Sequence, residues 1–139
     1  MNEQNYYRVS VKGIVIDDDG RILLAREDND EWEMMGGGLD HGEDPQAGLI
    51  REIMEETGLK VTSISDHPLY FLTAPRRNQQ SYIANVIYQI TLESYDFIPS
   101  SECQELRFVS VEEMKTLKLF PNVQELVRIL TKPTPNQPL

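Results

Sequence analysis

The sequence predicts one domain of the α/β class, and two observations carry that prediction. Short runs rich in β-branched and aromatic residues recur along the 139-residue chain, and a strongly capped helix lies between two groups of them. Hydrophobic residues make up 40% and charged residues 26% of the chain, a balance typical of globular proteins with a core of their own. We expect this domain to span residues 1–131, and the proline-rich, polar residues 132–139 to form a disordered tail.

The first predicted elements are two strands joined by a turn. Residues 7–16 are rich in β-branched side chains, residues 17–20 read Asp-Asp-Asp-Gly, and residues 21–26 form the returning strand. One alternative for the aspartates is a calcium loop, but the further ligand spacing and the closing glutamate of such a loop are missing. The segment therefore predicts a plain β-hairpin.

A helix is predicted for residues 45–57, after a glycine-rich loop at residues 27–44. Asp44 suits the N-cap, Pro45 suits the first helical position, and Gly58 suits the residue that ends the helix. The later elements are expected as strands at 61–65, 69–73, 81–92 and 106–109, a short helix that begins with the capping-box pattern of residues 110–113, and a last helix at 122–130.

Three glutamates gather on one side of the predicted helix. At about 100° per residue, Glu52, Glu55 and Glu56 fall within one arc. The arc also contains Gly48, whose missing side chain should leave room for a phosphate. Like charges at this spacing cost an isolated helix roughly 0.2–0.5 kcal/mol for each pair, so the cluster favours a site for Mg²⁺ or Mn²⁺ over the alternative of a solvated face. The opposite side, expected to face the core, carries Ala47, Ile50, Ile53 and Met54.

The formal net charge of −10 narrows the class of partners. It argues against a nucleic-acid polymer, because such binding depends on a cationic surface, whereas a phosphate substrate stays compatible when a metal reverses the local charge. No apolar run approaches the roughly 20 residues that span a bilayer, and no signal peptide is visible. Cys103 is the single cysteine, so no internal disulfide can form and we expect a cytoplasmic protein.

The residues around the helix resemble the Nudix box. That motif reads Gly, five residues, Glu, seven residues, Arg-Glu, an aliphatic residue, any residue, Glu-Glu, any residue, Gly and an aliphatic residue. Here Gly37 is followed by Glu43 and by Arg-Glu-Ile-Met-Glu-Glu-Thr-Gly-Leu at 51–59, so every fixed position is filled. Residues 32–37 resemble the family's Trp-Glu-x-Pro-Gly-Gly, with methionine in place of proline, and residues 105–109 resemble its late Glu-x-Arg-Trp-x strand.

The resemblance implies a fold, an activity and a cofactor. Nudix proteins form an α/β/α sandwich around a mixed β-sheet, and they hydrolyse a nucleoside diphosphate linked to a further moiety. The implied cofactor is Mg²⁺, with Mn²⁺ as a substitute. Carried over to this chain, the implied metal ligands are Gly36 through its carbonyl, Glu52, Glu55, Glu56 and Glu105.

The resemblance also assigns catalytic roles. Arg51, Glu52 and Glu55 would be catalytic, with Arg51 orienting a helix carboxylate. Glu52 and Glu55 are candidates for the base that takes a proton from water, and Glu102 and Glu105 in a later segment are the others. For Glu102 and Glu105, surface charge at a strand end is the plainer alternative.

The substrate is less constrained than the chemistry. Pro75 lies sixteen residues after Leu59, a spacing that resembles the ADP-ribose-cleaving branch of the family, yet a proline there also simply ends a strand. A nucleoside triphosphate is the other candidate, because the chain is short. The residues expected to contact substrate are Trp32 by stacking on a base, Gly37, Gly38, and Arg76 with its neighbour Arg77. The alternative for Trp32 is packing in the protein, and the alternative for Arg76 and Arg77 is exposure to solvent.

We therefore expect a small nucleotide as the partner, no nucleic-acid polymer and no membrane, and either a monomer or a homodimer. The alternative function is a non-catalytic Nudix-fold module that senses a nucleotide. Such a module would be expected to lack one of the box carboxylates. None is lacking here, so the enzyme is favoured.

Overall fold

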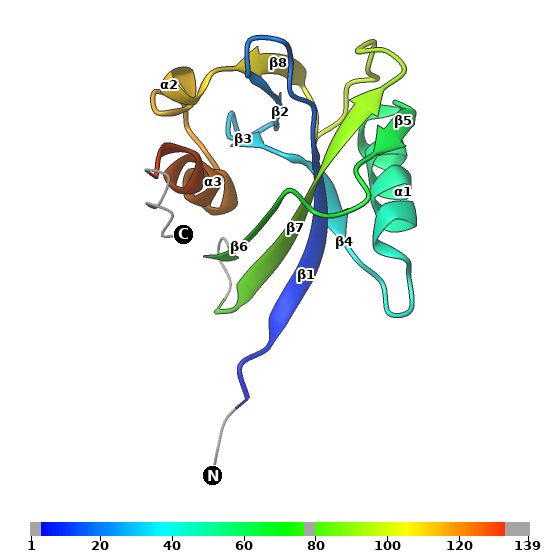
Figure 1. The fold of residues 1–139 in the computed structure, drawn as a ribbon, viewed down its shortest axis with the longest axis vertical. Coiled ribbons are helices and arrows are strands. Elements are labelled where there is room, and N and C mark those ends of the chain that lie inside the picture. The colour runs from blue at the N-terminus through cyan, green and yellow to red at the C-terminus, as the bar shows by residue number, and fades with distance from the viewer. Residues whose placement is uncertain (1–3, 77–79, 133–139) are drawn as a thin grey trace, which may run out of the picture.

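A computed structural model describes residues 4–76 and 80–132, in which eight strands and three helices are found (Figure 1). Their bounds are β1 Tyr7–Ile14, β2 Ile22–Arg26, β3 Trp32–Glu33, β4 Met35–Gly38, α1 Pro45–Thr57, β5 Val61–Ile64, β6 Tyr70–Pro75, β7 Tyr82–Leu92, β8 Glu105–Val109, α2 Val111–Met114 and α3 Pro121–Thr131. From Pro133 onward the expected tail lies outside the described residues. Within them, no helix combines the length and the apolar character that crossing a bilayer requires.

Five strands form a mixed sheet in the order β4-β1-β7-β5, with β6 also pairing with β7. β1 and β7 run parallel, from Tyr7 beside Tyr82 to Ile14 beside Gln89, whereas the other pairs in this sheet are antiparallel. β6 pairs with the first half of β7 and β5 pairs with its end. A second, antiparallel sheet has the order β3-β2-β8.

The hairpin expected at the start of the chain forms, but it is much shorter than predicted. Asp17 Oδ1 accepts hydrogen bonds from the amides of Asp19 and Arg21 at 3.0 and 2.8 Å, so the predicted turn forms. The pairing continues as an isolated bridge between Ile16 and Ile22, after which β2 leaves β1 and pairs with β8. Turn chemistry is local, and it carries no information about a partner strand from the far end of the chain.

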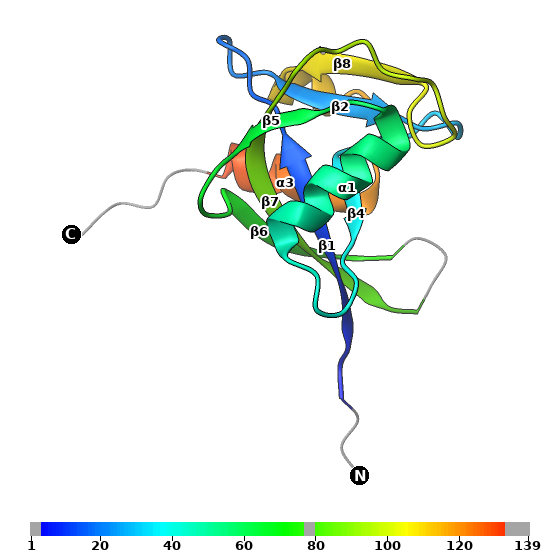
Figure 2. The ribbon, with the colours of Figure 1, turned by 90° about the vertical axis from the view of Figure 1, so that its right-hand side faces the viewer.

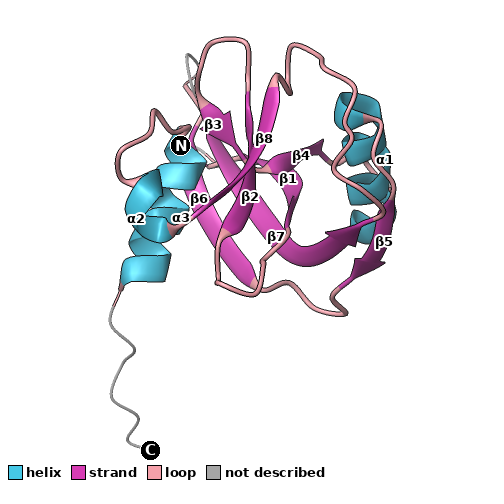
Figure 3. Ribbon diagram, turned by 90° about the horizontal axis from the view of Figure 1, so that it is seen from above, coloured by secondary structure: helices cyan, strands magenta, loops and turns pink. Residues whose placement is uncertain are grey.

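Helices cover both sides of the sheets. α1 packs on one side while α2 and α3 lie on the other, as the views in Figures 1, 2 and 3 show together. One buried cluster joins Leu49 and Ile53 of α1 to Val11 of β1, and a second contains Val123 and Leu126 of α3. The arrangement is an α/β/α sandwich around a mixed sheet, which confirms the expected fold class.

The helix α1 forms where its caps predict it. The Asp44 side chain accepts a hydrogen bond from the amide of Ala47 at 2.9 Å, and Pro45 occupies the first turn. Gly58 adopts a left-handed φ of 73°, and its amide donates to the carbonyl of Met54. Both ends of the helix are therefore confirmed.

The prediction for the buried face of α1 is confirmed for Ile53, which is fully buried, and wrong for the other three residues. Ile50 and Met54, expected in the core, are 42% and 46% exposed. Of the acidic arc, Glu52 and Glu56 lie against β4 instead, whereas the Glu55 side chain stays 60% exposed. A helical wheel identifies faces, but which face packs depends on β4, whose glycines lack strand propensity and lie in a segment expected to be a loop. The residues that α1 buries are Gly48, Leu49, Ile53 and Thr57.

Candidate active site

The acidic side of α1 lies against the glycines of β4. Gly36 has a φ of 126°, and a Cβ there would overlap the carbonyl oxygen of Val11 in β1. A Cβ on Gly37 would lie 2.5 Å from Glu52 Oε2. Glycine is therefore needed at Gly36, where φ is positive and the clash is with backbone, whereas a side chain at Gly37 would displace the Glu52 carboxylate.

Gly48 brings the loop before the helix close to α1. A Cβ at this position would lie 2.7 Å from Leu39 Cδ2 and 2.9 Å from Glu43 Oε1. The expectation that Gly48 leaves room for a phosphate is wrong, because the preceding loop fills that space. Glu43 also accepts a hydrogen bond from the amide of Asp40 at 3.2 Å, which braces the loop.

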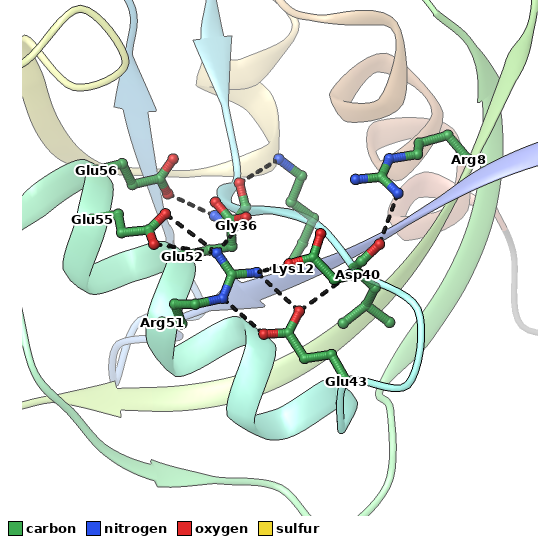
Figure 4. A network of polar contacts seen from close by, with 10 residues as sticks. Arg8, Lys12, Gly36, Asp40, Glu43, Arg51, Glu52, Glu55 and Glu56 are labelled. Atoms are coloured by element: carbon green, nitrogen blue, oxygen red, sulfur yellow. Dashed lines mark hydrogen bonds and ion pairs between the residues drawn. The ribbon is translucent and has the colours of Figure 1, made fainter.

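Arg51 is the centre of a carboxylate network on α1 (Figure 4). Its Nε and Nη2 donate to the two oxygens of Glu43 at 2.7 and 2.9 Å, a bidentate pair. Its Nη1 donates to Glu52 Oε1 at 3.1 Å and to both oxygens of Glu55 at 3.3 Å. The Arg51 guanidinium lowers the pKa of Glu43 to about 2, and Glu43 in turn raises the pKa of Arg51. One cation thus holds three carboxylates in place.

Glu56 points toward β4 rather than toward Arg51 (Figure 4). Its Oε1 accepts a hydrogen bond from the Gly36 amide at 2.7 Å. Burial raises the pKa of Glu56 to about 8; Lys12 and the Gly36 amide oppose this rise, and the nearby Glu102 carboxyl adds to it. A buried carboxylate with a raised pKa is stabilised in its charged form by a nearby cation.

Lys12 is a residue of the site that no motif in the sequence marks. Side chains alternate along a strand, so Lys12 shares the face of the core residue Ile14, and only 6% of it is exposed. Its Nζ donates to the carbonyls of Gly36 and Met34 at 3.1 and 3.3 Å and lies 3.7 Å from Glu33 Oε2. The available signal was its place between Val11 and Ile14, two apolar residues of the same strand that are both fully buried.

The two late glutamates have different surroundings. Glu105 Oε1 accepts a hydrogen bond from Arg26 Nε at 3.2 Å, where β8 pairs with β2. Glu102 lies close enough to Glu56 to raise its pKa. Cys103 between them is fully buried, and burial raises the pKa of its thiol to about 11, so it is an unreactive core residue.

Two of the residues expected to contact substrate pack against arginines. Trp32 is 4% exposed, and the Arg107 guanidinium lies 4.7 Å from the centroid of its ring, so the packing alternative describes this side chain. Gly38 lies beneath Arg8, where a Cβ would overlap the guanidinium. Arg8 itself donates to the Leu39 carbonyl at 2.7 Å. Gly38 therefore lets an arginine approach the glycine strand.

Arg76 lines a cavity of about 210 Å³ between the end of β6 and the start of α3. Pro75 also lines this cavity, and Glu33 and Asn122 are polar members of its wall. Arg77 lies outside the described residues.

A chain of buried amides lies behind this cavity. Asn122 Nδ2 donates to Glu33 Oε1 at 2.8 Å and to Asn85 Oδ1 at 2.9 Å. Asn85 is fully buried, and its Nδ2 has no hydrogen-bond partner among the described residues. The sequence did not reveal this group, because its members come from β3, β7 and α3.

The carboxylates of α1 fit a hard divalent cation in their chemistry, although they are not gathered in advance. In the part of the chain that the structure describes, no three acidic, histidine or cysteine side chains are arranged to hold a metal ion. Arg51 draws Glu52 and Glu55 to one side, while Glu56 turns to β4. Carboxylate oxygens are ligands that Mg²⁺ prefers, and Glu55, with a side chain that is 60% exposed, is more accessible to an incoming ion than Glu52, at 19%.

Comparisons with known proteins find similarity to MutT-like and NUDIX proteins. A MutT-like protein of Streptomyces ambofaciens is 48% identical over 56 residues, which are 40% of this chain and 36% of that protein. The nucleoside triphosphatase NudI of Enterobacter sp. (strain 638) is 27% identical over 118 residues, 76% of this chain and 84% of that protein. The crystal structure of a MutT NUDIX hydrolase from Burkholderia pseudomallei has a TM-score of 0.74 over 91% of this chain and 100% of that chain, at 18% identity.

These matches differ in extent. The chain spans about a third of the length of several curated relatives that it matches. At 18% identity the structural likeness shows the fold alone. The NUDIX domain family model, in contrast, matches residues 6–130, which include the glycine strand, α1 and the cavity beside α3. The chain belongs to the NUDIX domain family.

Proposed function

We propose that this chain is a Mg²⁺-dependent pyrophosphohydrolase that cleaves a phosphoanhydride bond of a nucleoside diphosphate linked to a further moiety. Arg51 carries the proposal, because it binds Glu43 through two hydrogen bonds and presents Glu52 and Glu55 beside the half-buried Glu56. Such a grouping destabilises a metal-free helix and suits a divalent cation. Nudix hydrolases generally use divalent metals.

Glu52, Glu55 and Glu56 would hold the cation. The family resemblance suggests the Gly36 carbonyl and Glu105 as further ligands. Each already contacts a cation of this chain, Lys12 for the Gly36 carbonyl and Arg26 for Glu105. A bound Mg²⁺ would neutralise the diphosphate and the charge that develops on it during hydrolysis.

Arg51 would act as the orienting residue of the site. It fixes Glu52 and Glu55 through Nη1 while its other nitrogens hold the preceding loop through Glu43. We propose that one carboxylate then accepts a proton from the attacking water. Glu52 and Glu55 are candidates on the helix. Among the late residues Glu102 has the better placement, because it lies beside Glu56.

Two substrate classes are proposed, an ADP-ribose-like compound and a nucleoside triphosphate. Pro75 ends β6, so the residue whose spacing suggests ADP-ribose also has the plain role of ending a strand. The likeness to NudI, a nucleoside triphosphatase by name, supports the second class. We infer that the base of either substrate enters the cavity between Arg76 and Asn122, whose guanidinium and amide can form hydrogen bonds with a heterocycle.

The test is phosphate release from a panel of nucleotides, read through a coupled phosphatase with Mg²⁺ and with EDTA. The panel holds ADP-ribose, other nucleotide sugars, NADH, dinucleoside polyphosphates and nucleoside triphosphates. We expect metal-dependent turnover of one class that Glu56→Gln abolishes. Glu112→Gln is the matched control, because Glu112 is an 83% exposed carboxylate on α2 and should leave turnover unchanged.

The opposite result has a defined meaning. If the folded chain turns over no member of the panel but binds a nucleotide from it tightly, the enzyme proposal fails. The chain would then be a Nudix-fold module that senses a nucleotide.

A further inference from the structure

Lys12 is buried among oxygen atoms beside α1. Its ammonium donates to the carbonyls of Gly36 and Met34 at 3.1 and 3.3 Å and lies 3.7 Å from Glu33 Oε2. Figure 4 shows the contact with Gly36. The two carbonyls accept hydrogen bonds from the ammonium, and the Glu33 carboxylate forms an ion pair with it. Among the described residues Lys12 is the one basic side chain in the buried class. Burial of a charge costs several kcal/mol unless it is well paired, so this lysine needs all of these partners.

The charge of Lys12 reaches beyond the atoms that it contacts. Gly36, whose carbonyl Lys12 contacts, donates its amide to Glu56 of α1 at 2.7 Å. The charge of Lys12 also opposes the larger effect of burial on the pKa of Glu27, the residue that follows β2. With Glu33, three carboxylates therefore surround this one ammonium. They come from α1, from the residue that follows β2, and from β3, so Lys12 lies where these segments meet the main sheet.

The oxygen atoms around Lys12 are of the kind that a hard divalent cation prefers. Mg²⁺ and Mn²⁺ bind backbone carbonyls and carboxylates, and an ammonium is a compact point charge that suits the same partners. The Gly36 carbonyl is itself one of the ligands that the family resemblance suggests for the metal. In this chain it already accepts a hydrogen bond from a cation.

We propose that Lys12 is a built-in cation of the site, which holds the Gly36 and Met34 carbonyls and the Glu33 carboxylate in place of a divalent ion. Lys12 is a positioning residue, since it acts on Glu56 through the backbone of Gly36, whose amide binds that carboxylate. The native chain then binds one divalent cation fewer than a variant with a neutral residue at position 12. The inference rests on the proposed function in taking the carboxylates of α1 as a metal site.

The test counts Mn²⁺ bound per chain, from the loss of the free Mn²⁺ signal in electron paramagnetic resonance. The variants are Lys12→Met, Lys12→Gln, which is neutral but can still donate hydrogen bonds, and Lys12→Arg, which keeps the charge. Lys115→Met is the matched control, because Lys115 is exposed on α2 and pairs with Glu112 there. Melting temperature with and without Mn²⁺ is measured on the same samples.

We expect one additional Mn²⁺ per chain in Lys12→Met and Lys12→Gln, and the native number in Lys12→Arg and Lys115→Met. The two neutral variants should melt lower than the native chain without metal and recover more on saturation with Mn²⁺. If every folded Lys12 variant binds the same number of Mn²⁺ ions as the native chain, the inference is wrong. Should Lys12→Met not fold, Lys12→Gln decides alone.

The proposed function fails in a different way. If the native chain binds no Mn²⁺, and Glu56→Gln does not change its melting in Mn²⁺, the site on α1 is wrong. Binding by the native chain together with an unchanged number in the neutral Lys12 variants leaves that site standing and removes only the role of Lys12.

Discussion

Gly36 links backbone conformation to the site, because its amide binds Glu56 and its φ of 126° excludes side chains. We expect Gly36→Ala to lower the free energy of unfolding by about 2–4 kcal/mol, since the new Cβ meets the Val11 carbonyl. Gly20→Ala is the control, because Gly20 also has a positive φ, 79°, but no atom within 4 Å of its Cβ position. It should cost only about 1–2 kcal/mol. Equal losses in urea unfolding would contradict the steric argument.

Arg51 makes contacts that a lysine cannot reproduce. A guanidinium spans both oxygens of Glu43 while a third nitrogen reaches Glu52 and Glu55, whereas an ammonium is a single point. We expect Arg51→Lys to lower kcat about tenfold to a hundredfold through misplaced carboxylates, with a smaller effect on KM. Steady-state kinetics on the substrate found in the panel measure both constants.

The control for this variant is Arg128→Lys. Arg128 is an exposed arginine that pairs with Glu125 on α3, away from the carboxylates of α1. If both variants change kcat equally, the orienting role of Arg51 is wrong. A loss that appears in KM alone would point instead to uniform substrate binding.

Whether a residue of the site could be predicted from the sequence depends on how far away its partners lie in the chain. Glu43, Arg51 and the helix glutamates could be predicted as a group, because they lie within two turns of one helix and the loop before it. Lys12 and Asn85 could not, since their partners come from other strands and from α3. Spacing in the sequence reports contacts along one element, whereas a buried cation is recognised only when the sheet brings the oxygens to it.

The secondary structure elements show the same limit. The caps of α1 are local hydrogen bonds, so Asp44 and Gly58 were enough to predict both ends of the helix. β4 was missed because its stability comes from pairing with β1, Gly36 beside Lys12, and not from strand propensity. The buried face of α1 was misassigned in part for the same reason, since β4 is the surface on which Glu52 and Glu56 pack.

Metal binding by the glutamates of α1 should raise the melting temperature of the chain. Saturating Mg²⁺ should raise the melting temperature by several degrees, because a ligand at a hundred times its Kd stabilises the folded state by about 2.7 kcal/mol. Glu56→Gln should remove most of the shift, and Glu55→Gln should reduce it. Thermal unfolding followed by circular dichroism, with and without EDTA, gives the shift. An unchanged shift in both variants would place the metal elsewhere, whereas Glu112→Gln should behave as the native chain does.

The whole molecule concentrates acidic groups where its two sheets and α1 meet. The chain carries a formal charge of −10, and Glu27, Glu33, Glu56 and Glu102 lie within electrostatic reach of one another or of Lys12 there. Burial raises the pKa of Glu27 to about 7; Glu33 and Glu102 add to the rise and Lys12 opposes it. The free energy of unfolding of the metal-free chain should therefore depend on pH.

Stability of the metal-free chain should fall as pH rises from about 4.5 to about 7. The folded-state pKa of Glu27 lies above its ordinary value of 4.5, so the folded chain holds this proton more tightly than the unfolded chain does. The resulting stabilisation is full below pH 4.5 and is lost as pH rises through about 7. Because Glu27 is only half-buried, solvent screens part of this effect. Glu27→Gln should therefore raise the free energy of unfolding at pH 8 by only about 1–2 kcal/mol and leave it unchanged near pH 4.

Urea unfolding in EDTA across this range measures the effect. Glu56, with its pKa raised to about 8, acts in the same direction, so Glu27→Gln should flatten the curve only in part. Glu112→Gln should leave the curve as in the native chain, because that side chain is 83% exposed. If Glu27→Gln instead lowers stability at pH 8, the Glu27 carboxylate stabilises the fold when charged. The negative charge of Glu27 would then not destabilise the region where the two sheets meet.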